Sequence, residues 1–177
     1  MIGLADGMVR VVPYNPGWPL VYRAEERLLR TLIGVYVKEI NHIGSTSIPG
    51  LSAKPIIDMM AVVLDYEDGQ MCIPILEHSG YQYQGDLGMP GCLVFAKGGN
   101  GFHTHYLHIL VYESQLYHDY LIFRDYLRSH RDAAAVYSGL KQRLALQYVG
   151  DSEAYQVQKI EFILKIISQS KTRSEAG

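Results

Sequence analysis

The chain has 177 residues, 48% of them hydrophobic, and its 16 lysines and arginines against 18 aspartates and glutamates give a net charge of −2. A chain of this length and apolar content can bury one substantial core, so a single domain spanning residues 1–177 is expected. The near-zero charge excludes a global basic field, so nucleic acid is not expected as a partner, with a local basic patch left as the alternative. Any anionic ligand must be recognised by a local patch of side chains.

The cysteines and the N-terminus restrict the redox state and the compartment. Cys72 and Cys92 show none of the Cys-x-x-Cys or Cys/His spacings typical of zinc sites, which favours two reduced, structural thiols. Residues 1–8 lack the charged start and apolar core of a signal peptide, and no apolar run reaches roughly 18 residues. The sequence therefore predicts a soluble, cytoplasmic protein with no membrane partner.

The N-terminal half reads as a helix followed by two strands and a second helix. Residues 13–19 hold three prolines and a glycine, which is typical of a rigid loop, and Leu20–Ile33 then shows apolar residues at helical spacing. Val35–Ile43 and Pro55–Leu64 read as strands, and the second is nearly all apolar, which indicates a buried strand of a central sheet. The pattern of Tyr66–Ser79 is helical again.

The C-terminal half changes from strands to helices. Glycine-rich loops separate three further strands, Tyr81–Tyr83, Leu93–Lys97 and Thr104–Tyr112. Apolar residues at three- and four-residue spacing predict three helices, Leu116–Ser129, Ala133–Val149 and Glu153–Ile167. Residues 168–177 are polar and are expected to fray, so the core spans about residues 9–167. The fold class is mixed α/β (α+β), with a helical layer formed by the C-terminal third.

One segment, His42-Ile-Gly-Ser-Thr-Ser-Ile-Pro-Gly-Leu-Ser-Ala-Lys-Pro-Ile-Ile-Asp58, joins a turn of small residues to an acid on an apolar strand. Gly44 permits a sharp turn. Ser45, Thr46 and Ser47 offer hydroxyls and backbone N–H groups at an expected helix start, where phosphate binds readily.

Asp58 lies in the apolar run Ile56–Val63, so its carboxylate must be paired, neutral or bound to a metal ion. Two interpretations stand at this point, a functional acid or a structural acid that caps a nearby loop. Lys54, four residues earlier, suits a phosphate contact, and the alternative is an ion pair with Asp58 that satisfies the acid without a ligand.

The segment resembles the glycine-serine and aspartate signature of the nucleotidyltransferase-fold superfamily, and more closely the GrpB-like family (uncharacterised protein family 0157). The residues that support this resemblance are Pro13–Trp18, His42–Leu51, Ala53–Asp58, His105–His108, Phe123–Arg128, and the spacings Tyr137-x-x-Leu-Lys141 and Tyr155-x-x-x-Lys159. They extend over most of the chain, about residues 9–167.

The resemblance implies a nucleotidyltransferase-like mixed sheet with flanking helices and a metal-dependent transfer of a nucleotidyl group from a nucleoside triphosphate to an unknown hydroxyl acceptor. Mg²⁺ or Mn²⁺ would be the metal, held by Asp-x-Asp or Asp-x-Glu. Met60 stands at the second position of that pattern and cannot bind a hard cation. This departure favours the alternative of a degenerate module that binds a nucleotide or another phosphorylated metabolite.

The histidine-rich strand Thr104–Leu110 is expected at the place of the superfamily's strand with the third carboxylate. His108 is the preferred partner of Asp58, both as a catalytic acid or base and as a metal ligand. Strand alternation places His103 and His105 on the opposite face. A zinc-dependent or histidine-assisted phosphohydrolase is a third reading, and a hydrogen-bonded core histidine is the structural one.

Three basic residues of the helical part complete the candidate site. Arg124 suits a phosphate fork, and Lys141 and Lys159 resemble positions of the family motifs that would form an anion-binding rim with it. For each of them the alternative is an ordinary solvated surface charge.

Overall fold

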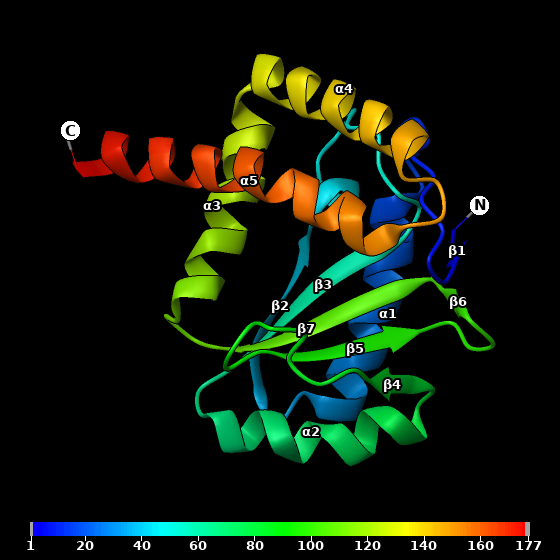
Figure 1. The fold of residues 1–177 in the computed structure, drawn as a ribbon. Coiled ribbons are helices and arrows are strands. Elements are labelled where there is room, and N and C mark those ends of the chain that lie inside the picture. The colour runs from blue at the N-terminus through cyan, green and yellow to red at the C-terminus, as the bar shows by residue number, and fades with distance from the viewer. Residues whose placement is uncertain (1, 176–177) are drawn as a thin grey trace.

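The computed structural model describes residues 2–175, which form a mixed α/β fold (Figure 1). The helices are α1 (Trp18–Ile33), α2 (Tyr66–His78), α3 (Gln115–Ser129), α4 (Arg131–Gln147) and α5 (Ser152–Glu175). The strands are β1 (Leu4–Ala5), β2 (Val37–Ile43), β3 (Ile57–Val63), β4 (Tyr81–Tyr83), β5 (Leu93–Lys97), β6 (Phe102–His103) and β7 (His105–Val111). None of the helices in this part of the chain is long and apolar enough to cross a membrane.

The central sheet has the strand order β2-β3-β7-β5-β4. β2 and β3 are antiparallel, β3 and β7 are parallel, and β5 is antiparallel to both β7 and β4. The expected nucleotidyltransferase-like layout is present, because the strand that ends at the glycine-serine turn lies beside the strand of Asp58, and the histidine-rich strand lies on the other side of it.

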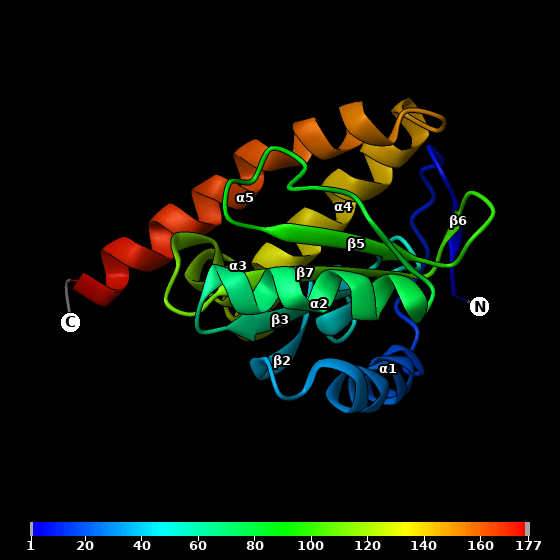
Figure 2. The same cartoon turned by 90° about the horizontal axis from the view of Figure 1, so that it is seen from below.

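Helices cover both faces of this sheet (Figures 1 and 2). On one face α1 and α2 pack on the odd-numbered residues of β3, where Met59 and Ala61 are fully buried with Leu29 and Leu76 of the helices. On the other face the even-numbered residues, such as Met60 and Val62, pack against α3. Asp58 belongs to this second face, which also carries the α4 and α5 layer above α3.

The expected elements agree closely with the observed ones, and the differences concern the C-terminal tail and the short strands β1 and β6. Residues 168–175 continue α5 to Glu175, so the predicted frayed tail is wrong over this stretch, and residues 176–177 lie outside the described part. One contact of the added helical turns is an ion pair of 2.8 Å between Lys171 and Asp119 of α3. The sequence pattern also missed the two-residue strand β1, which pairs with β6. Cys72 and Cys92 are free and buried, as expected.

Candidate functional site

Asp58 lies near the start of β3, between two neighbouring strands. Its partner across the antiparallel pair is Ile43 of β2, the last residue before the glycine-serine turn, and its partner across the parallel pair is Tyr106 of β7. The side chain is partly buried and points toward the helical layer of α3 to α5. A carboxylate at this position is enclosed by protein but can still be reached by a ligand.

Gly44 brings the turn into direct contact with this acid. Its φ of 65° is in the left-handed region, and a Cβ added there would lie only 2.9 Å from the Cβ of Asp58. Any larger residue is therefore excluded by both backbone strain and overlap. The turn continues as one short 3-10 helix, Ser45–Ser47, in place of the longer helix start that we expected.

The three hydroxyls of the turn have different neighbours. The Oγ of Ser45 accepts a hydrogen bond from Lys141 Nζ at 2.8 Å and borders a small cavity beside Asp58. Thr46 Oγ1 instead lies 3.0 Å from His42 Nε2, and Ser47 Oγ donates to the carbonyl of Gly44 at 2.7 Å. The structure thus brings Ser45 to Asp58, whereas Thr46 and Ser47 use their hydroxyls to hold the turn.

The cavity beside Asp58 gathers three lysines from distant parts of the chain, and we call it the lysine cavity. Its volume is about 60 Å³, and its lining residues are Ser45, Lys54, Ile56, Asp58, Tyr106, Lys141, Tyr155, Gln156 and Lys159. The lysines come from the loop before β3, from α4 and from α5. The alternative that these lysines are solvated surface charges is wrong for Lys141, which is only 1% exposed.

The three amines differ in how fully the protein satisfies them. Lys141 Nζ donates to Ser45 and to the carbonyl of Ser52, and its amine lies 4.6 Å from the centre of the Tyr137 ring. Lys54 Nζ donates to Ser152 Oγ at 3.1 Å.

Lys159 differs, because within the described residues it has no hydrogen-bond acceptor, and its amine lies 4.4 Å from the centre of the Tyr155 ring. Lys159 therefore retains donors for a ligand.

Burial and mutual repulsion perturb the charges of this cluster. Burial raises the pKa of Asp58 to about 6, against the opposing effect of Lys159, Lys54 and Lys141. Burial and the neighbouring Lys54 lower the pKa of Lys159 to about 7, and burial with Lys159 lowers that of Lys141 well below its ordinary value. Each shift arises because water is excluded from a charged group.

The expected alternative of a direct ion pair between Lys54 and Asp58 is absent. Among the described side chains, no lysine amine lies within the 4.0 Å ion-pair distance of the Asp58 carboxylate. Asp58 attracts all three amines without contacting any of them. The arrangement leaves a gap between acid and amines.

A second, larger cavity of about 410 Å³ adjoins the lysine cavity, and we call it the apolar cavity. Ser45, Asp58, Gln156 and Lys159 line both. The remaining wall is largely apolar or aromatic and comes from the sheet, α3, α4 and α5, and it includes Met89, Tyr120, Phe123, Tyr137, Ile160 and Ile163. Together the two cavities form a charged end joined to an apolar chamber.

His108 lies on the same sheet face as Asp58, but its ring contacts other groups. Its register partner on β3 is Met60, and its Nδ1 lies 3.4 Å from the Tyr120 hydroxyl and 3.8 Å from Cys92 Sγ. Burial lowers its pKa to about 4, which keeps the imidazole neutral near pH 7. The structure thus places His108 in the wall of the apolar cavity, two residues along β7 from Tyr106, the register partner of Asp58.

Arg124 is not part of the lysine cavity. Its guanidinium donates to the carbonyl of His42 at 3.3 Å and pairs with Asp125 at 2.7 Å. The structure therefore gives this arginine a role in fixing the end of β2, and it does not bring it to Asp58.

A family model and several known proteins match most of this chain. The family model described as GrpB protein matches residues 8–169. The chain belongs to the GrpB family. A UPF0157 protein of Pseudomonas aeruginosa is 36% identical over 93% of this chain and 69% of its own length. The glutamate-rich protein GrpB of Alkalihalophilus pseudofirmus is 34% identical over 96% and 99%.

The crystal structure of the conserved protein GrpB from Enterococcus faecalis superposes with a TM-score of 0.86 at 32% identity and covers 93% of this chain and 99% of that chain. The observed fold is therefore the GrpB fold throughout.

The donor set at Asp58 does not fit the divalent metal that the nucleotidyltransferase resemblance implies. Among the described residues, Asp58 is the only carboxylate of the lysine cavity, Met60 follows it on the same strand face, and three amines surround it. Within residues 2–175, no three His, Cys, Asp or Glu side chains gather closely enough to hold a metal ion. Amine protons repel a cation and attract an anion, so this donor set suits phosphate.

Two tyrosines of the site were not among the expected residues. Tyr137 and Tyr155 place their rings under the amines of Lys141 and Lys159. The signal was present as the repeated Tyr-x-x-x-Lys spacing, because residues four apart lie on one helix face.

Proposed function

We propose that this GrpB-family domain binds a phosphorylated small molecule, with nucleotides as the first class of candidates, at Asp58 and the three lysines around it. The observation that supports this most directly is the charge of the lysine cavity. When all four groups are ionised, three amines face one carboxylate, and the excess positive charge is enclosed where water screens it weakly. A phosphate group would balance this charge and accept the unused hydrogen bonds of Lys159.

The adjoining apolar cavity suits the remainder of such a ligand. Its volume of about 410 Å³ falls within the range of about 300–1,000 Å³ typical of small-molecule sites. The rings of Tyr120, Phe123 and Tyr137 offer flat apolar surface to a nucleobase or another aromatic group. The ligand would thus lie with its phosphate at Lys159 and its apolar body between the sheet and α5.

Nucleotidyl transfer is the second candidate, although Asp58 alone would have to supply the carboxylate for the divalent metal that this reaction uses. It is favoured by the contact of the Gly44 turn with Asp58 on adjacent antiparallel strands, the layout that the superfamily resemblance implies. In that reaction an acceptor hydroxyl would attack the α-phosphorus of a nucleoside triphosphate and pyrophosphate would leave. Ser45 and Lys159 would hold the phosphates, and Asp58 or His108 would accept the proton of the hydroxyl.

Thermal unfolding with a panel of nucleoside triphosphates and phosphorylated metabolites tests the proposal. The panel is run in EDTA and again with Mg²⁺, Mn²⁺ or Zn²⁺. A ligand at about 100 times its Kd stabilises by about 2.7 kcal/mol, which raises the Tm by roughly 5–10 °C. We expect such a rise in EDTA, its loss in Lys159→Met, and its retention in Lys165→Met, a control at an exposed lysine of the same helix.

Asp58→Asn separates the two candidates. Removing this carboxylate leaves the amines in place, so anion binding in EDTA is retained or strengthened. A metal-dependent site instead shows a shift only with a divalent ion, and Asp58→Asn abolishes it. If no ligand and no metal moves the Tm of the wild type, both candidates are wrong.

A further inference from the structure

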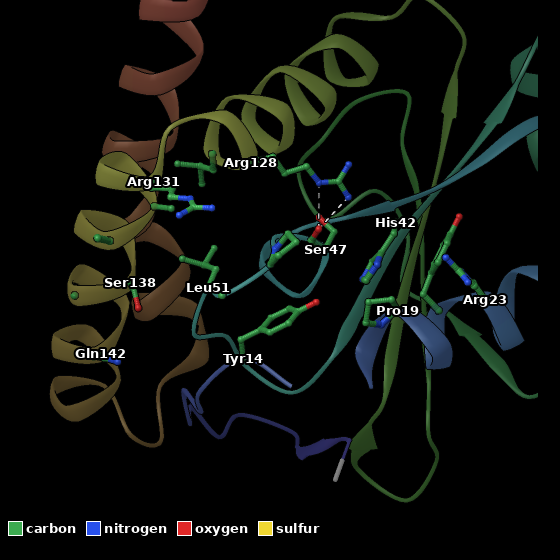
Figure 3. A pocket seen from close by; sticks show the side chains of 17 residues that line it. Tyr14, Pro19, Arg23, His42, Ser47, Leu51, Arg128, Arg131, Ser138 and Gln142 are labelled. Carbon is green, nitrogen blue, oxygen red and sulfur yellow. Dashed lines mark hydrogen bonds between the residues drawn. The ribbon is translucent and has the colours of Figure 1, made fainter. Parts of the chain in front are cut away.

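A separate groove lies between α1, the loop of residues 47–51 and the helices α3 and α4 (Figure 3). Its volume is about 1120 Å³. Ser47 borders it, whereas Ser45 of the same turn borders the lysine cavity, and no residue lines both sites. The groove is therefore distinct from the phosphate site proposed above.

The charged side chains that line this groove are all positive. Arg23, Arg128 and Arg131 come from α1, α3 and α4, and none of the described aspartates or glutamates lines it. The whole chain has 18 acidic against 16 basic residues, so the absence of acids here is a local feature. We call this site the arginine groove.

The arginines are placed at separate points of the groove. Figure 3 shows Arg128 directed at Ser47, with Arg131 on one side of it and Arg23 far off on the other. Arg128 donates from Nε and Nη2 to the carbonyl of Ser47 at 3.1 and 2.9 Å, which fixes its orientation. Arg23 and Arg131 are exposed, and no carboxylate pairs with either among the described side chains. Because the three arginines come from three different helices, they offer separate contacts to a chain of phosphates.

Aromatic side chains line the same groove as the arginines. Tyr14 and Tyr22 border it, and Tyr22 stacks on His42 with 4.7 Å between ring centres and 8° between planes. Burial, together with Arg128 and Arg124, lowers the pKa of His42 to about 3, so this buried imidazole is neutral and supports the ring of Tyr22 from behind. The part of the groove wall formed by α4 includes small residues such as Ala134 and Gly139.

We propose that the arginine groove binds a single strand of nucleic acid, with the arginines on successive phosphates and the bases against the tyrosines. A groove that combines cationic and aromatic side chains is the kind of surface with which proteins hold single strands without reading their sequence. The volume also exceeds the range of about 300–1,000 Å³ typical of small-ligand sites. The expectation that nucleic acid is not a partner rested on net charge, which does not report a local groove.

Fluorescence anisotropy with labelled single-stranded RNA and DNA of about twelve nucleotides tests this inference. At about 50 mM salt we expect a Kd on the order of 10⁻⁵ M for the full chain. The double substitution Arg23→Ala with Arg131→Ala should weaken binding about tenfold or more. It should also reduce the slope of log Kd against log salt by about 1.4, since each lost phosphate contact on a single strand contributes about 0.7.

The matched control is Arg27→Ala with Arg143→Ala, which removes the same charge from exposed positions of α1 and α4 outside the groove. Equal weakening by the two double variants would reduce the effect to general charge and overturn the inference. So would the absence of binding by the wild type, or competition by a mononucleotide as effective as that by the strand. Lys159→Met should leave strand binding unchanged, which distinguishes this site from the lysine cavity.

Discussion

At the scale of the residue, the site depends on one close approach and on one unsatisfied amine. Gly44 lets the turn reach Asp58, and among the described residues Lys159 lacks the hydrogen bonds that hold Lys141 and Lys54. The lysines differ in the hydrogen bonds that their amines make, and therefore in their expected roles. Lys141 is bonded on several sides and ties α4 to the turn, so we expect it to hold the site together, whereas Lys159 is available to a ligand.

Substitution of Gly44 by alanine should therefore be costly. The new Cβ would overlap the Asp58 side chain and hold a non-glycine residue at a φ of 65°, so we expect the free energy of unfolding to fall by about 2 kcal/mol or more. Gly80→Ala is the control, since Gly80 has a φ of 88° and open space at its Cβ, and should lose only about 1 kcal/mol. Urea denaturation measures both. Equal losses would show that contact with Asp58 adds nothing.

At the scale of the element, each helix of the C-terminal layer contributes side chains to the two cavities. The spacing Tyr-x-x-x-Lys on α4 and α5 puts a ring and an amine on the same face, and this relation follows from the helical period alone. Helix α3 closes the apolar cavity with Tyr120 and Phe123. The N-cap of α3 is Ser114, whose side chain accepts a hydrogen bond from the backbone N–H of Tyr117 at 3.3 Å.

The N-cap of α3 gives a prediction for this element. Ser114→Ala should lower the free energy of unfolding by about 1 kcal/mol, because one backbone N–H at the start of the helix loses its acceptor. Ser114→Gly should cost only a few tenths of a kcal/mol, since glycine is itself tolerated at N-caps. Chemical denaturation compares the two variants with the wild type. A glycine variant as unstable as the alanine variant would contradict the capping role.

At the scale of the whole molecule, the fold concentrates like charges that are far apart in the sequence. Lys54, Lys141 and Lys159 meet around one acid only because the C-terminal helices close over the sheet. This arrangement is unfavourable without a ligand, since burial of the amines opposes their protonation. We interpret the cost as the preparation of an anion site.

The pH dependence of the free energy of unfolding can reveal this cost. Between a pKa of about 7 in the folded protein and the ordinary 10.5, the unfolded chain keeps a proton that Lys159 has released, so stability rises with pH across this window. Lys159→Met removes this effect. The variant should be more stable than the wild type near pH 7, and the gap should close toward pH 10.5 by at most about 1.4 kcal/mol per pH unit.

Urea denaturation at several pH values measures this gap, with Lys165→Met as the control for a methionine at an exposed position of α5. A Lys159→Met variant that is no more stable than the wild type at pH 7 would show that the buried amine carries no cost.

The local sequence pattern predicted most of the elements, the sharp turn at Gly44 and the acid on a buried strand. These features depend on local periodicity and on backbone conformation, which neighbouring residues fix. It also indicated Lys54, Lys141 and Lys159 individually, through their positions in motifs. The length of α5 was not evident, because residues 168–175 are polar and their helix has tertiary contacts such as Lys171 with Asp119.

Which of the candidate residues meet depends on the packing of the helices on the sheet. Packing directs the lysines toward Asp58 and turns Arg124 to the carbonyl of His42 and His108 to Tyr120. The arginine groove depends on packing in the same way, because Arg23 and Arg131 are separated by more than half of the chain. Side-chain direction and long-range contact are set by how helices lie on the sheet, and no local pattern records that arrangement.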